Sequence, residues 1–95
     1  MTIHFLKTDH ETYRNMESGE KTFDYRKNDR DFKVRDKVTL RDYFPDIRGR
    51  YTQEYDVYGS SIDFEITYIL YGGKYGLPDN YCIMQLKRLR GMYYG

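Results

Sequence analysis

The chain has 95 residues, the length of one domain, and its 16 basic residues nearly balance its 15 acidic ones. This balance argues against a polycation dedicated to coating nucleic acid, although it leaves room for a local basic face. The 12 tyrosines and 5 phenylalanines suit so small a domain, because tyrosine buries its ring while its hydroxyl stays in water.

The N-terminal part predicts a short strand over residues 2–7 and then a helix over roughly residues 9–17. Thr8 and Glu11 have the spacing of a capping box, in which the hydroxyl accepts a backbone N–H and the glutamate reaches back to the cap. Gly19 follows where helices commonly end in the left-handed conformation. We therefore expect a strand, a capped helix and a tight exit at Gly19.

A second strand is predicted over residues 21–27, because its side chains alternate in character. Two faces result, one with Phe23 and Tyr25 and the other with Thr22, Asp24 and Arg26. The next four residues, Asn-Asp-Arg-Asp, are typical of a turn.

The middle of the chain predicts a strand, a loop and another strand. Residues 37–44 alternate, with one face formed by Val38, Leu40 and Asp42 and the other by Thr39, Arg41 and Tyr43. Residues 45–49 are typical of a hairpin loop, and the polar run over residues 50–58 predicts an edge strand.

The last part contains the strongest strand pattern in the chain. Five apolar side chains alternate over nine residues, namely Ile62, Phe64, Ile66, Tyr68 and Leu70. A glycine-rich loop over residues 72–78 leads to a closing strand over residues 81–89, and we expect residues 91–95 to be a flexible tail.

These elements predict a mainly β (α+β) fold. Five to six short strands with one capped helix in 95 residues favour a small, open and mostly antiparallel β-barrel. We expect one domain over residues 1–90, followed by the tail.

Cys82 is the only cysteine, so no disulfide can form within the chain and a thiol-reducing compartment is its natural location. It lies in an apolar run and is expected to be a buried small hydrophobe rather than a reactive thiol. The first residues are too polar for a signal peptide, and no run approaches the roughly 20 apolar residues of a membrane span. We expect a cytoplasmic protein without a membrane partner.

The sequence indicates neither a metal site nor a cofactor. His4 and His10 are isolated, so each is expected to be structural or solvated. Gly72, Gly73 and Gly76 do not open a helix, which favours turns with positive φ over a phosphate-binding loop.

Basic residues gather in two stretches of the chain. Seven of them lie between Arg26 and Arg41, against three acids, and Lys87, Arg88 and Arg90 follow near the C-terminus. If the two stretches meet in the fold, they form a positive face with tyrosine and phenylalanine interleaved for base stacking. Alternatively, they are solvated strand faces that pair with acids across strands.

The segment Ser18–Phe32 carries the sharper signal. Lys21 lies at the helix-to-strand corner, and Asp24 and Arg26 share one strand face about 6.6–7 Å apart. Together they could recognise a phosphate or a base edge, and a desolvated lysine could act as a base or nucleophile. The alternative is a salt bridge that only orders the corner and contributes about 0–1 kcal/mol when exposed. Spacing alone favours the salt bridge.

Residues 19–26, Gly-Glu-Lys-Thr-Phe-Asp-Tyr-Arg, resemble the Gly-x-Lys-x-x-Glu-x-Arg motif of ASCH domains, which are relatives of the PUA RNA-binding fold. The likeness extends from Ile3 to about Leu89 and is to small ASCH/PUA-like proteins of bacteria and their phages. It rests on further segments, namely Leu6–Asp9, Arg26–Phe32 with Val34 and Asp36, Thr67–Leu70 and Gly72–Leu77. Two departures are Asp24, where glutamate is usual, and Arg35, where glycine often precedes Asp36.

The resemblance implies a helix beside a cleft of the barrel, with RNA or a nucleotide-like ligand as the partner. By position, Gly19 is the turn, Lys21 and Arg26 are cations of the cleft, and Asp24 is its acid. The ligand-binding residues that we expect are Gly19, Lys21, Asp24, Arg26, Lys27, Asn28, Arg30 and Tyr75.

Some ASCH proteins resemble amidohydrolases that remove an acyl group from modified cytidine. That likeness implies catalysis by Lys21 and Asp24 with a separate glutamate, for which Glu65 is the first candidate and Asp63 the second. Asp24 falls where those enzymes carry a threonine. Three hypotheses therefore stay open: a module for RNA or a nucleotide-like ligand, a small amidohydrolase on N-acylated cytidine or a related nucleoside, and a module that binds a phage or host protein.

Overall fold

The structure, a computed structural model, describes residues 1–43 and 60–89. Its elements in chain order are β1 (Ile3–Asp9), α1 (His10–Ser18), β2 (Phe23–Lys27), β3 (Lys37–Tyr43), β4 (Ser61–Tyr71) and β5 (Tyr81–Arg88). The predicted hairpin loop, the predicted edge strand over residues 50–58 and the predicted tail all lie outside the described residues.

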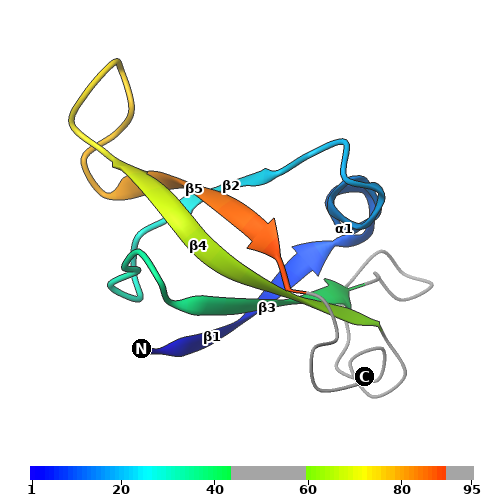
Figure 1. The fold of residues 1–95 in the computed structure, drawn as a ribbon. Helices are drawn as coiled ribbons and strands as arrows, with labels where there is room; N and C mark the ends of the chain where they lie inside the picture. Colours follow the sequence, from blue (N-terminus) through cyan, green and yellow to red (C-terminus); the bar gives the residue numbers. More distant parts are fainter. Residues whose placement is uncertain (44–59, 90–95) are drawn as a thin grey trace.

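The strands form one curled sheet in the order β1-β3-β4-β5-β2. β1 runs parallel to β3, and every other pair of neighbours is antiparallel. The sheet bends into a half-barrel, and α1 lies at the end where β1 stops and β2 begins (Figure 1). The predicted mainly β fold, a small open barrel with one short helix, is confirmed.

The core lies on the inner face of the sheet and is closed by α1. Alternate residues of the strands supply most of it, and Tyr13 and Met16 of the helix, with Phe32 between β2 and β3, complete it. The strand members buried to 4 % exposure or less include Leu6, Val38, Leu40, Phe64, Ile66, Cys82, Met84 and Leu86. Fully burying one such large side chain contributes about 1.5–3 kcal/mol, so this face holds the fold together.

A β-bulge interrupts the alternation of β4. Ile66 pairs with Leu86 but Tyr68 pairs with Gln85, so the strand gains one residue at Thr67. Residues 62, 64 and 66 face the core before the bulge, whereas Ile69 does so after it, at 6 % exposure. Tyr68, which shares the predicted alternation with Ile66, is 60 % exposed instead. That alternation is therefore wrong beyond Ile66, because an inserted residue exchanges the two faces of a strand.

The helix cap differs from the predicted one by one residue. Asp9, not Thr8, is the N-cap: it has φ −60° and ψ 152°, and its carboxylate accepts the N–H of Thr12 at 3.1 Å. Thr8 stays extended and buried because it remains in register with Asp42 of the parallel strand β3. At the other end, Gly19 ends the helix at φ 86°, as predicted.

The β4–β5 loop contains the expected positive-φ turns, at Gly73 (φ 90°) and Gly76 (φ 80°). Gly72 is restricted for a different reason: a Cβ there would overlap the carbonyl oxygen of Pro78. Gly72 lets the two arms of the loop approach each other closely.

We expect Gly72→Ala to destabilise the protein by about 2–3 kcal/mol, because backbone must move to admit the methyl group. Gly76→Ala, where nothing lies within 4 Å of the added Cβ, should cost about 1–2 kcal/mol from backbone strain alone. Urea denaturation of both variants measures the difference. An equal or smaller effect at Gly72 would show that the loop opens without cost.

Candidate ligand-binding pocket

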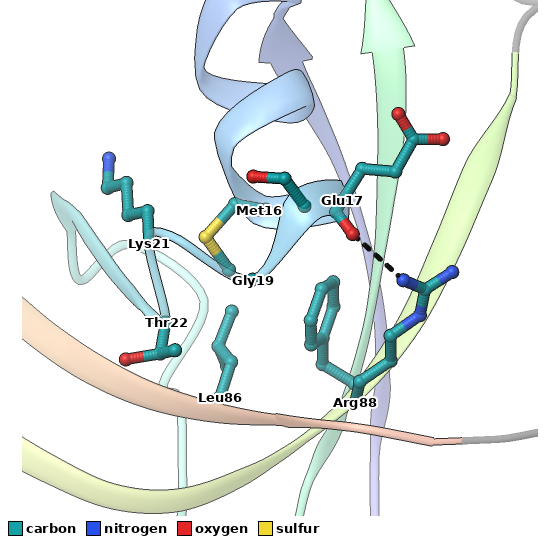
Figure 2. A pocket seen from close by; sticks show the side chains of 9 residues that line it. Met16, Glu17, Gly19, Lys21, Thr22, Leu86 and Arg88 are labelled. Atoms are coloured by element: carbon teal, nitrogen blue, oxygen red, sulfur yellow. Dashed lines mark hydrogen bonds between the residues drawn. The ribbon is translucent and has the colours of Figure 1, made fainter.

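A pocket with a volume of about 140 Å³ opens at the C-terminal end of α1. Its apolar lining comes from Met16 of the helix, Phe64 of β4 and Leu86 of β5. Lys21 and Arg88 stand on opposite sides of this lining (Figure 2). The pocket therefore combines an apolar wall with two cations that come from distant parts of the chain, and the acidic residue Glu17 also lines it.

The turn at Gly19 brings Lys21 to the pocket. Its left-handed conformation reverses the chain, so that the N–H of Lys21 donates to the carbonyl of Asn15 at 3.1 Å. The carbonyl of Thr22 then accepts the N–H of Leu86 at 2.9 Å, which ties the segment to β5. These backbone hydrogen bonds fix the position of the pocket's rim.

Arg88 and Lys21 are anchored differently. Arg88 Nη1 donates to the carbonyl of Glu17 at 3.0 Å, a favourable place for a cation because helix C-termini carry partial negative charge (Figure 2). Lys21 Nζ lies 5.1 Å from the centre of the Phe23 ring. In the described parts of the chain, Lys21 forms no ion pair within 4.0 Å. Its ammonium group is thus available to an anion.

The charge of Lys21 also reaches the helix cap. Burial raises the pKa of Asp9, but hydrogen bonds from Thr12 and the nearby charge of Lys21 outweigh it and bring that pKa below its usual value.

The Asp24–Arg26 pair lies elsewhere, at the seam between the edge strands β1 and β2. Asp24 is 4 % exposed and accepts a hydrogen bond from Arg26 Nε at 2.6 Å. Arg26 Nη2 also donates to the carbonyl of Lys7 at 3.3 Å and to the hydroxyl of Thr8 at 3.5 Å. The pair joins two strands that do not pair through their backbones, so Arg26 closes the half-barrel with its side chain.

Two other predicted ligand residues also have structural roles. Arg30 Nη1 donates to the carbonyl of Phe5 on β1 at 3.2 Å, which extends the seam. The side chain of Asn28 accepts the N–H of Phe32 at 3.1 Å and so holds the β2–β3 turn.

The remaining predicted site residues lie away from the pocket. Lys27 pairs with Tyr81 at the far end of β5, and Tyr75 is in the β4–β5 loop, 88 % exposed. Seven strand residues, roughly 23 Å at 3.3 Å each, separate Phe64 in the pocket from the start of that loop. Glu65 lies on the outer face of the sheet and accepts a hydrogen bond from Arg35 at 3.2 Å.

The two basic stretches of the sequence meet on this outer face. Glu65 lies between Lys37 of β3 and Lys87 of β5 in the strand register. The sheet thus brings Arg35 and Lys37 near Lys87, with one carboxylate between the two lysines, whereas Arg88 of the C-terminal stretch lines the pocket on the other side of the sheet.

The sequence did not predict two histidine–aspartate contacts, of which the one at His4 is buried and the one at His10 is partly exposed. His4 Nε2 lies 2.9 Å from Asp36, and His10 Nδ1 lies 3.0 Å from Asp42. Both aspartates are buried, at 5 % and 6 % exposure. One sequence feature could have indicated the contact at Asp42. This residue follows Val38 and Leu40 on the inward face of β3, where a carboxylate needs a partner. The expectation of a structural role for the histidines agrees with these contacts.

Cys82 is fully buried, as predicted. Burial and then the charge of Asp24 raise the pKa of its thiol, which keeps it protonated. Within residues 1–43 and 60–89, no three metal-ligating side chains are grouped to hold an ion. The same residues contain no helix that is long and apolar enough to cross a membrane.

Residues 3–86 match a protein family described as a domain of unknown function, DUF3850. The chain belongs to this family. The DUF3850 match runs from the first residue of β1 into β5 and includes Lys21 and the whole seam, whereas Arg88 lies two residues beyond it. No curated protein matches the chain.

Proposed function

We propose that this DUF3850 protein binds a nucleotide-like ligand, free or as part of RNA, in the pocket at the end of α1. The observation that carries the proposal is the placement of Lys21 and Arg88 on opposite sides of an apolar lining. A ligand with a flat apolar part and an anionic group satisfies both features at once. Nucleobases and phosphates provide this combination.

The size of the pocket limits what it encloses. Pockets that take up a drug-sized ligand measure roughly 300–1,000 Å³, whereas this one has about 140 Å³. It therefore receives one group, a base or a phosphate, and leaves the rest of the ligand outside. This favours a terminal or flipped-out nucleotide of a longer strand, or a small free nucleotide.

The sequence motif supports binding more than catalysis. Its resemblance to ASCH domains implies a cleft cation at Lys21, and Lys21 lines the pocket, which supports the proposal. A hydrolase would need Lys21, Asp24 and Glu65 around one substrate. Asp24 is instead buried against Arg26, and Glu65 is bonded to Arg35 on the outer face. We therefore propose a binding module rather than an amidohydrolase.

Lys21→Ala is expected to weaken binding of a short oligouridylate by about tenfold, because it removes a charge-assisted contact of about 1.5 kcal/mol. It should also reduce the dependence of log K on log salt by about 0.7, the contribution of one phosphate contact on a single strand. Fluorescence anisotropy across a salt series measures both quantities.

Lys74→Ala is the matched control, because it removes the same charge from the exposed β4–β5 loop. It should leave affinity and salt dependence nearly unchanged. Equal losses in the two variants would mean that only overall charge matters, and the pocket assignment would then fail.

A further inference from the structure

The outer face of the sheet carries a cluster of rings and aliphatic side chains that we call the aromatic face. Its members lie on β2, on β5 and on the part of β4 after the bulge: Phe23, Tyr25, Tyr68, Leu70, Tyr81 and Ile83. The strand register aligns them in rows. One row is Phe23, Gln85 and Tyr68, and the next is Tyr25, Ile83 and Leu70. They therefore form one continuous surface.

Three of the four rings of the aromatic face are exposed, and the fourth, Tyr81, is half-buried. Phe23 is 47 % exposed, Tyr25 48 % and Tyr68 60 %. The core takes its residues from the opposite side of the same strands, so these rings add little to folding. The bulge at Thr67 puts Tyr68 there, since the uninterrupted alternation would turn it inward with Ile66. Contiguous apolar surfaces of this kind mark interaction sites.

The arrangement suits stacking against flat partners. Phe23 and Tyr25 are two residues apart on one strand, about 6.6–7 Å, and both point outward. The Tyr25 ring stacks on Tyr81 with centroids 5.2 Å apart and 18° between planes, which holds both rings in place. Rings exposed on an open sheet that stack two or three bases are a known way of binding single-stranded RNA.

The charges around the aromatic face fit a polyanion. Lys27 and Lys87 lie at its two ends, and none of the outward residues of β2 and β5 is acidic. Glu65, level with Lys87 on β4, is already bonded to Arg35. An apolar protein surface would leave these lysines without a counterpart, whereas a nucleic acid supplies bases for the rings and phosphates for the cations.

From this combination we infer that the aromatic face stacks the bases of a single-stranded nucleic acid. Lys21, whose ammonium lies over the Phe23 ring, also lines the pocket at the end of α1. It joins the two surfaces, so one strand runs across the rings and ends with a single group in the pocket. This inference rests on the proposed function and narrows its ligand from nucleotides in general to single strands.

The test compares a fluorescein-labelled oligouridylate, an oligothymidylate of equal length and free UMP. Tyr68→Ala should weaken binding of the oligonucleotides roughly 5- to 150-fold, the range measured when one base–aromatic stack is removed. The affinity of Tyr68→Ala for UMP should stay within about twofold of the native value, because Tyr68 lies two strands away from Phe23 and Lys21. Tyr68→Phe keeps the ring and should bind like the native protein. Tighter binding of the oligouridylate would indicate contact with the ribose 2′-hydroxyl, whereas equal binding of both oligomers would indicate that the sugar is not contacted.

Tyr75→Ala is the control for loss of an exposed tyrosine, because Tyr75 lies in the β4–β5 loop outside the aromatic face. It should leave oligonucleotide binding unchanged. If UMP binds as tightly as the oligonucleotides and Tyr68→Ala changes neither, the stacking inference is wrong while the proposed function stands. If neither UMP nor the oligonucleotides bind, both are wrong, and a protein partner becomes the occupant to seek on this face.

Discussion

Replacement of Arg26 by methionine is expected to lower the free energy of unfolding by about 2–3 kcal/mol, because the buried Asp24 carboxylate loses its partner. Asp24 has 6 % side-chain exposure and depends on Arg26 Nε at 2.6 Å. Breaking a fully buried pair costs about 3–5 kcal/mol, but Arg26 keeps 25 % side-chain exposure, so water can replace part of the contact. The carbonyl of Lys7 also loses a donor at the open seam.

Arg30→Met provides the matched control, because it removes another arginine that donates to a carbonyl of β1. That contact, to the carbonyl of Phe5, is exposed, and its loss should lower the free energy of unfolding by only about 0.5–1 kcal/mol. Chemical denaturation of both variants, with the Asp24→Asn/Arg26→Met double variant, completes the comparison. The double variant should be less destabilised than the two single effects together, since each side chain is costly mainly when left without the other. Additive effects would contradict a specific pair.

The same variants test the part that Asp24 plays in binding. In the structure Asp24 orients Arg26 and lies outside the residues that line the pocket. Folded Asp24→Asn protein should therefore keep its affinity for oligouridylate within about twofold, in contrast to the roughly tenfold loss expected for Lys21→Ala. A loss in Asp24→Asn equal to that in Lys21→Ala would place the carboxylate in the binding site.

Asp36→Asn should destabilise the protein by about 2–4 kcal/mol near neutral pH, because a neutral amide cannot accept all the hydrogen bonds that converge on this buried carboxylate. They come from His4 Nε2 at 2.9 Å, the N–H of Thr2 at 3.1 Å and the N–H of Lys33 at 3.1 Å. These contacts join the start of β1 to the turn before β3.

The destabilisation should depend on pH in a defined direction. Burial raises the pKa of Asp36, but the hydrogen bonds from His4, Thr2 and Lys33 outweigh it and hold that pKa below its usual value. The ionised carboxylate therefore stabilises the fold fully above the unfolded pKa of about 3.9, and this contribution is lost as the pH falls through the lower folded pKa. The difference in the free energy of unfolding between the native protein and Asp36→Asn should be constant above about pH 5 and shrink below about pH 4.

Asp31→Asn is the control for that experiment. Asp31 is exposed, forms a surface pair with Lys33 at 3.4 Å and should contribute about 0–1 kcal/mol. Urea denaturation at several pH values separates the two variants. The loss of unfolding free energy in Asp36→Asn could instead stay constant down to the pH at which the protein unfolds. That result would show that the Asp36 carboxylate is not the stabilising group.

The sequence was sufficient for features that depend on near neighbours. The strands over residues 1–43 and 60–89, the helix and the left-handed Gly19 follow from periodicity and glycine placement, and the structure confirms them, whereas the predicted strand over residues 50–58 lies outside the described residues. The cap was misplaced by one residue, because whether Thr8 stays in β1 depends on its pairing with Asp42, far along the chain. Lys21 is held at the end of α1 partly by the turn beside it and partly by the hydrogen bond between Thr22 and Leu86 of β5, and its role in binding stays a prediction.

Tertiary structure decided which distant residues meet and which face each side chain takes. Arg88 joins Lys21 because β5 passes beneath the end of α1, and Arg26 contacts Lys7 because the sheet curls until its two edge strands approach. Tyr68 points outward because a single inserted residue exchanges the faces of β4. Periodicity and glycine placement thus predicted the described elements of this DUF3850 protein, and the spacing in Ser18–Phe32 with its family resemblance indicated Lys21 as a candidate cation. Strand order, curl and one bulge, which depend on contacts across the whole chain, determined their partners.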